Sequence, residues 1–344
     1  MSKEKRTELI RKIEEKRGTK LITYLTSTRT NLEVQMAIDV IRKIYEHLKV
    51  IEDGEKGKVE IDLLLVSNGG DGTVPWRLVT LIREYAEKFS VLIPFRAFSA
   101  ATLTALGADE VIMHPMGMLG PTDPTVSNPF NPSDPANPKN KLGISVEDVT
   151  AYISLIKEDA GITHEDELVQ AFNKLAENVH PLALGNVKRS LAQSRMMAHK
   201  LLALHMNKSR ELHEINEIVD NLTSKLYYHG HPINRKEAKD QIGLRTIVNP
   251  TPEIEKLMWD LYSEYENEIK ADEPFDPLME FISKNEALAV GANNSVEITS
   301  KLAFVESTQR TDFAEIRHRI FGVKQNNGGY QIVPNIIERG WKTE

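Results

Sequence analysis

The sequence of 344 residues contains no cysteine. Disulfide bonds, thiolate nucleophiles, iron–sulfur clusters and cysteine-based zinc sites are therefore excluded together. A disulfide-stapled secreted fold is excluded for the same reason. Any catalytic nucleophile must be sought among hydroxyls and other groups without a thiol, and we expect neither a metal nor a cofactor.

Long apolar runs and an excess of positive charge are also missing. Residues 1–20 are charged and lack the apolar segment of a signal peptide, and no later stretch approaches the roughly 18 apolar residues of a membrane span. With 43 Lys and Arg against 50 Asp and Glu, the formal net charge is −7. We therefore expect a soluble, cytoplasmic protein with no integral membrane segment and no nucleic-acid partner.

Short apolar segments alternate with segments of helical periodicity. The expected strands are residues 21–26, 59–66, 90–95 and 110–113, and the expected helices between them are 32–48, 76–89 and 99–106. Strands that alternate with helices predict right-handed crossovers and a parallel sheet covered by helices. The fold class is therefore α/β.

The remaining segments suggest how the chain is organised. They are a charged, solvated N-terminal helix over 1–20, a Pro/Asn-rich loop over 117–143, a long helical excursion over 145–206, a charged helix over 251–270, and a small α+β appendage over 272–344 with strands at 296–306 and 330–333. We expect a catalytic core over 21–271, in which the Pro/Asn-rich loop borders the active site.

Two turns rich in glycine or small residues follow successive expected strands. They are Ser67-Asn68-Gly69-Gly70-Asp71-Gly72 and Ala97-Phe98-Ser99-Ala100-Ala101-Thr102. Ligands of open α/β sheets bind at these carboxyl ends of the strands. Taken singly, the first could be an ordinary turn and Ser99 a helix N-cap. Together, a serine at a helix N-terminus beside free amides offers a nucleophile and an oxyanion hole for acyl transfer.

The order of these segments resembles the Clp protease and crotonase superfamily. Two further stretches carry the likeness, Met113-His114-Pro115-Met116-Gly117-Met118-Leu119-Gly120-Pro121-Thr122-Asp123-Pro124 and Tyr228-His229-Gly230-His231-Pro232-Ile233-Asn234-Arg235-Lys236-Glu237-Ala238-Lys239-Asp240-Gln241-Ile242-Gly243-Leu244. Within the superfamily the chain is most similar to the signal peptide peptidase A branch and its relatives called serine dehydrogenase proteinases. The resemblance implies a ClpP/crotonase-like core of repeated β-β-α and βαβ units, and a homo-oligomer.

The resemblance also implies roles for residues of the two turns. Ser99 would be the nucleophile, and the amides of Gly70 and Ala100 would form the oxyanion hole. The substrate-binding positions that we expect are Gly69, Asp71, Gly72, Pro121 and Thr122.

Relatives of signal peptide peptidase A imply a serine–lysine dyad, in which a desolvated lysine accepts the serine proton. We favour Lys141, because it precedes the expected helix that starts at Ser145, and keep Lys139 and Lys157 as alternates. A Clp-type triad is disfavoured, since alignment of the preceding strand puts the family histidine near Thr122 and not at His114.

Other acidic and histidine residues receive weaker interpretations. Asp71 and Asp123 could orient a base or a water molecule, although acidic residues in such turns usually cap their own backbone. His229 and His231 form a His-Gly-His turn that could be a metal pair, but we interpret it as structural.

These observations favour an ATP-independent serine peptidase that cleaves peptides or unfolded proteins through an acyl-enzyme on Ser99. A crotonase-like acyl-CoA enzyme could use the same oxyanion hole, although such an enzyme needs no serine at position 99. A non-catalytic scaffold that binds partners through residues 272–344 is a third hypothesis.

Overall fold

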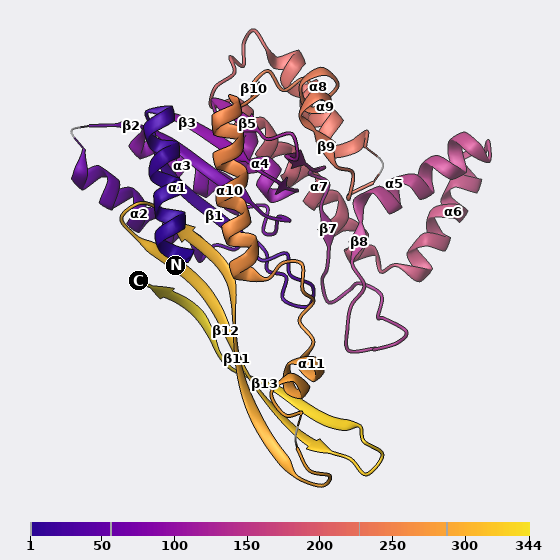
Figure 1. Ribbon diagram of the computed structural model, residues 1–344. Coiled ribbons are helices and arrows are strands. Elements are labelled where there is room, and N and C mark those ends of the chain that lie inside the picture. Colours follow the sequence, from indigo (N-terminus) through magenta and orange to yellow (C-terminus); the bar gives the residue numbers. More distant parts are fainter. Residues whose placement is uncertain (1, 56, 227, 287) are drawn as a thin grey trace.

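A computed structural model describes residues 2–55, 57–226, 228–286 and 288–344, and within them eight strands form one mixed sheet (Figure 1). The strand order is β10-β5-β3-β2-β1-β11-β12-β13. The parallel strands are β1 (Lys20–Thr26), β2 (Val59–Val66), β3 (Ala86–Ile93), β5 (Glu110–Met113) and β10 (Ile247–Val248). The antiparallel strands are β11 (Asn293–Glu306), β12 (Thr311–Lys324) and β13 (Tyr330–Thr343).

The parallel half of the sheet agrees with the α/β prediction. Its strands are nearly continuous apolar runs because both faces are covered, and Leu63 of β2 lies between Ile22 of β1 and Val91 of β3. Strand β3 begins earlier than expected, since the preceding helix ends at Tyr85 and not near Phe89.

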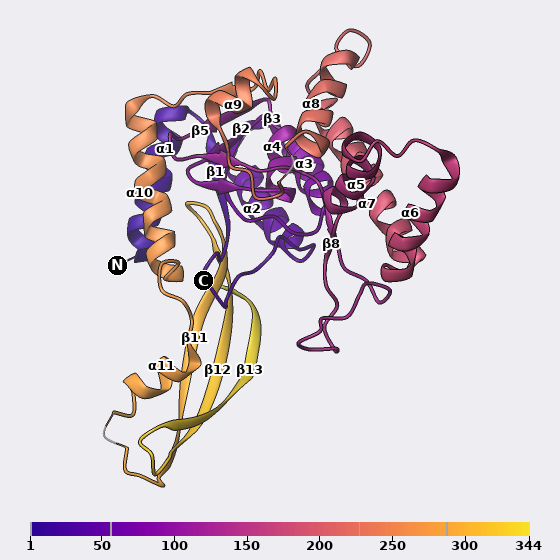
Figure 2. The same cartoon turned by 90° about the vertical axis from the view of Figure 1, so that its right-hand side faces the viewer.

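Helices cover both faces of this half (Figure 2). One face carries α1 (Ser2–Arg17) and α10 (Pro252–Ile269). The other face carries α2 (Val40–Gly54), α3 (Val74–Tyr85), α4 (Ala100–Leu106), α7 (Pro181–Leu202) and α8 (Leu212–Ser224). No helix of the described residues is both long and apolar enough to cross a membrane.

Helix α1 is more than a solvated, charged leader. Its Leu9, Ile10 and Ile13 are buried in a cluster shared with α10 and β1. Its Arg6 is only 3% exposed and donates a hydrogen bond to Glu306 of β11 at 2.8 Å. The helix and its exposed lysines match the expectation of a charged helix with a solvated face, whereas the apolar stripe was not foreseen.

The last three strands form a long arm that projects from the helical layers (Figures 1 and 2). Strand β11 joins the arm to the core by pairing with β1, for example Val305 with Tyr24, so the sheet is continuous across the expected boundary at residue 272. Helix α11 (Pro277–Ser283) packs on the arm through the buried Phe281. Strand β12 lies where the sequence pattern gave no strand.

The shorter elements lie around the carboxyl ends of the parallel strands. They are β4 (Arg96–Ala97), β6 (Met118–Leu119) and β9 (Ile233–Asn234), which pair with one another, and β7 (Thr125–Val126) and β8 (Ile144–Ser145), which form a second pair. The helical excursion consists of α5 (Val146–Ser154), a π-helical turn over Leu155–Asp159, α6 (Glu165–Asn178) and α7, and α9 (Arg235–Asp240) follows β9. These connections bring distant parts of the chain to the sheet edge beside Ser99.

Candidate active site

The turn after β2 depends on two glycines with positive φ. Gly69 has φ +95°, and a Cβ there would lie 2.7 Å from the Phe98 carbonyl oxygen and 2.8 Å from Ser99 Cβ. Gly70 has φ +152°, and a Cβ there would lie 2.4 Å from the Met36 carbonyl oxygen. Only glycine fits both positions, so the turn packs directly against the turn that carries Ser99.

Ser99 has backbone angles that a serine rarely adopts. Its φ is 52° and its ψ is −112°, and it precedes the first turn of α4. Thr102 helps to hold this conformation, because its hydroxyl lies 2.7 Å from the Ala97 carbonyl oxygen and accepts a hydrogen bond from the Gly120 amide at 3.0 Å. A strained residue held by its surroundings is a feature of functional turns.

Two backbone amides beside Ser99 are available as donors. Within the described residues, neither the Gly70 nor the Ala100 amide donates to a protein acceptor, whereas Asp71 donates to Met36 and Ala101 donates to Phe98. Ala100 also begins a helix, where unpaired N–H groups and the helix dipole favour negative charge. The geometry thus suits stabilisation of an oxyanion.

The two turns open into a cavity of about 330 Å³. Of the residues expected to bind substrate or to react, those that line it are Ser99, Gly70, Asp71, Gly72 and Thr122. Gly69 does not line the cavity but packs against Phe98 and Ser99. Pro121 lines a small adjacent pocket. Gln35, Ser190 and Gln193 also line the cavity, from the β1–α2 connection and α7.

His229 lines the same cavity as Ser99 and pairs with Asp123. Its Nδ1–H donates to Asp123 Oδ1 at 2.9 Å, and Asp123 is only 2% exposed. This hydrogen bond raises the pKa of His229 above its ordinary value of 6.5, against the effect of burial. Because Nδ1 is engaged, Nε2 remains as the proton acceptor, and this is the arrangement of a catalytic histidine oriented by a carboxylate.

The described residues include no hydrogen bond between Ser99 and His229. Such contacts are often long before substrate binds. The sequence interpretation of His229 as structural missed this pairing, because 106 positions separate it from Asp123. The local signal was that His229 lies within the stretch from Tyr228 to Leu244, which carried the resemblance. His231 is engaged elsewhere, with Glu237 at 2.7 Å.

The three candidate lysines do not line the cavity of Ser99. Lys141 is exposed and donates to Ser133 at 3.1 Å, within the loop that joins β7 to β8. Lys139 is exposed in the same loop, which extends away from the sheet (Figure 1). Lys157 lies beside an apolar hollow between α5 and α6. All three side chains are exposed to solvent.

A family model described as ClpP-like SDH-type serine proteinase matches residues 1–285 of the chain. The chain belongs to this family. The ClpP-like fold and the resemblance to the serine dehydrogenase proteinases are thereby confirmed.

Two uncharacterized proteins of Methanocaldococcus jannaschii are similar to this chain. MJ1495 is 31% identical over 128 residues, which cover 35% of this chain and 41% of its own length. MJ0137 is 26% identical over 263 residues, which cover 75% of this chain and 79% of its own length. The chain therefore spans less than half of the first relative and most of the second.

Two solved structures are also similar, both of variants of the 1510-N membrane-bound stomatin-specific protease. A serine-to-alanine mutant is 13% identical, with a TM-score of 0.37, and the match covers 65% of this chain and 79% of the other. A lysine-to-alanine mutant in complex with a substrate peptide is 14% identical, with the same TM-score of 0.37, and covers 64% and 74%. Likeness at this level says nothing about individual site residues.

Proposed function

We propose that the chain is a serine peptidase in which Ser99 forms the acyl-enzyme. The observation that carries this proposal is the single cavity that holds Ser99, a carboxylate-oriented histidine and the turn with the free Gly70 amide. Membership of a serine proteinase family supports the same chemistry.

His229 is the general base of the proposed mechanism. Its Nε2 accepts the proton of Ser99 as Oγ bonds to the carbonyl carbon of the scissile peptide, and the Gly70 and Ala100 amides donate to the resulting oxyanion. Breakage of the C–N bond then releases an amine that takes this proton from His229. A water molecule then attacks the ester carbonyl as His229 takes its proton, and His229 returns that proton to Ser99 Oγ as the C–O bond breaks and the carboxylic acid product leaves. Asp123 holds the imidazole in one tautomer throughout.

The predicted serine–lysine dyad is the competing assignment of the base. Within one chain it would require Lys141, Lys139 or Lys157 to move into the cavity, because all three lie outside its lining. Replacement by alanine distinguishes the assignments. His229→Ala abolishes hydrolysis if the histidine is the base, whereas Lys141→Ala, Lys139→Ala or Lys157→Ala abolishes it if a lysine is.

The function is tested with unstructured fluorogenic peptides and a fluorophosphonate probe, without added nucleotide. Wild-type protein is expected to cleave the peptides and to be labelled, and Ser99→Ala is expected to do neither. Ser190→Ala is a matched control, since Ser190 lines the cavity on α7 and has no role in the mechanism. Labelling and hydrolysis that persist in a well-folded Ser99→Ala variant would refute the proposal. Binding of acyl-CoA without any peptide cleavage would favour the crotonase-like alternative.

A further inference from the structure

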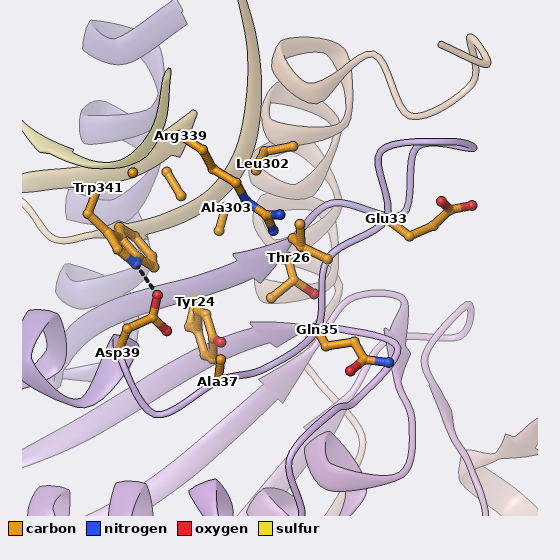
Figure 3. A pocket seen from close by; sticks show the side chains of 13 residues that line it. Tyr24, Thr26, Glu33, Gln35, Ala37, Asp39, Leu302, Ala303, Arg339 and Trp341 are labelled. Atoms are coloured by element: carbon orange, nitrogen blue, oxygen red, sulfur yellow. Dashed lines mark hydrogen bonds between the residues drawn. The ribbon is translucent and has the colours of Figure 1, made fainter. Parts of the chain in front are cut away.

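A second and larger cavity lies between the arm and the connection from β1 to α2. Its volume is about 590 Å³. The core side contributes Tyr24, Thr26 and the segment 33–39, and the arm contributes Leu302, Ala303, Ala314 and residues 339–341 (Figure 3). The mechanism proposed above uses none of these residues.

Arg339 is the cation of this cavity. Its side chain reaches from β13 toward Thr26 and Ala303 (Figure 3). Within the described residues it has no hydrogen bond or ion pair, unlike Arg317 and Arg319, which bond to Glu338 and Glu297 respectively. A guanidinium that faces a cavity without a carboxylate partner is suited to bind a carboxylate of a ligand.

Two acidic side chains limit what that ligand can be. Asp39 lines the cavity and accepts a hydrogen bond from the Trp341 indole at 2.8 Å, and Glu33 lies on the same wall. Both would repel phosphates and other ligands of high negative charge. A single carboxylate on an otherwise neutral chain carries less negative charge than a phosphate, so Asp39 and Glu33 repel it less while Arg339 attracts it. An acidic residue of a peptide has this property.

Gln35 connects this cavity to the active site, because it lines both. The backbone of its neighbour Met36 bonds to the turn that contains Gly70. The Met36 amide donates to the Gly69 carbonyl at 2.8 Å, and the Met36 carbonyl accepts from the Asp71 amide at 3.0 Å. The backbone N–H and C=O of Gln35 have no partner among the described residues. Successive residues of an extended segment turn their backbone groups to opposite sides, so those of Gln35 are free to pair with an extended peptide.

We propose that the cavity under Arg339 is a substrate subsite, which binds the carboxylate of an acidic residue in the same peptide that Ser99 cleaves. The peptide crosses Gln35, and its acidic side chain meets Arg339 beside Trp341. This inference rests on the proposed peptidase function and adds to it a preference for acidic residues at a distance from the scissile bond.

Binding to the Ser99→Ala protein tests the subsite without dependence on turnover. Fluorescein-labelled, unstructured peptides that differ only in having Asp, Asn or Lys at one scanned position are titrated and followed by anisotropy. When the scanned position is the one that reaches Arg339, the Asp peptide should bind about two- to fivefold more tightly than the Asn peptide, as expected for one exposed ion pair. Arg339→Ala should remove this difference, and Arg339→Glu should transfer the preference to the Lys peptide.

Arg319→Ala is the matched control, because Arg319 is on the same arm but outside the cavity. It should keep the full preference for Asp. Equal affinity for Asp and Asn peptides at every position, or equal loss in Arg319→Ala, would overturn the subsite.

Failure of the proposed peptidase function is distinguishable from failure of the subsite, because it appears as a wild-type protein that cleaves no peptide. Cleavage of a peptide without acidic residues should be the same in Arg339→Ala and wild type, and a large loss there would show that Arg339 supports the fold and not a subsite.

Discussion

The molecule contains two clusters of serine, histidine and aspartate that differ in their access to solvent. His229 and Asp123 lie with Ser99 at a cavity. In the second cluster, His47 Nδ1 lies 2.9 Å from Ser307 Oγ and Nε2 lies 3.3 Å from Asp312 Oδ2.

The second cluster has the tighter contacts but none of the other requirements of a catalytic site. His47 and Asp312 are fully buried, and Ser307 is 4% exposed in the turn between β11 and β12. The cluster fastens that hairpin of the arm to α2. The comparison shows that close approach of the three residue types is not sufficient, since catalysis also needs a cavity and oxyanion donors.

The largest expected difference between the two clusters is in kcat, after replacement of His229 or His47 by alanine. His229→Ala should lower kcat for peptide hydrolysis by about 10⁴- to 10⁶-fold, as removal of a base from a triad does. Its melting temperature should fall less than that of His47→Ala, because His229 is partly exposed whereas His47 is fully buried. His47→Ala should keep kcat in the folded protein and lower the melting temperature, since it empties a fully buried site. Calorimetry and peptide assays on both variants measure this crossover. Similar loss of activity in both would contradict the assignment.

The two aspartates should differ in a similar way, with a smaller effect. Burial alone would raise the pKa of Asp312, but the nearby His47 and hydrogen bonds from Arg310, Thr343 and Lys43 hold this pKa well below its ordinary value. Asp312→Asn leaves these groups without their anion and should cost about 3–5 kcal/mol of unfolding free energy. Asp123→Asn should instead reduce kcat by about 10⁴-fold. Urea unfolding and peptide assays measure the two effects.

The sign of the pH dependence gives an additional check on Asp312. Its folded-state pKa is depressed, so its contribution to stability is present above the unfolded-state pKa near 3.8 and is lost as the pH falls below it. Unfolding free energy should therefore depend less on pH below about 4 in Asp312→Asn than in wild type. An unchanged acid slope would show that Asp312 does not carry this linkage.

The comparison also shows how far the sequence was informative. Strands β1, β2 and β5 were predicted within a residue, because each is an apolar run bounded by turn residues. Strand β12 was missed because charged residues interrupt it, among them Arg317 and Arg319, which form ion pairs across the arm. Cross-strand pairing, which the sequence of one strand does not contain, makes this segment a strand.

The candidate site was predicted only in its local part. Ser99 and the glycine turn were recognisable because each belongs to one short segment with unusual residues. The pairing of His229 with Asp123 depends on how β9 and the segment after α8 return to the sheet edge, which no spacing in the sequence encodes. The preference for Lys141 rested on its position before a helix, and that position leaves it in a hydrated loop.

The smallest predicted effect is on the proton affinity of His229, which differs from that of His114 and His205. Its pKa is raised by Asp123, whereas burial lowers the pKa values of His114 and His205. A histidine must be neutral to act as a base, so the rate of peptide hydrolysis should fall as the pH drops through a midpoint above 6.5. NMR titration of the Ser99→Ala protein should show the His229 signal, assigned by its loss in His229→Gln, with a midpoint above 6.5. Asp123→Asn should lower that midpoint and leave the titration of His205 unchanged, since His229 bonds to Asp123 whereas His205 bonds to the Leu106 carbonyl. An acid limb that persists in Asp123→Asn at its original pH would assign the titrating base to another group.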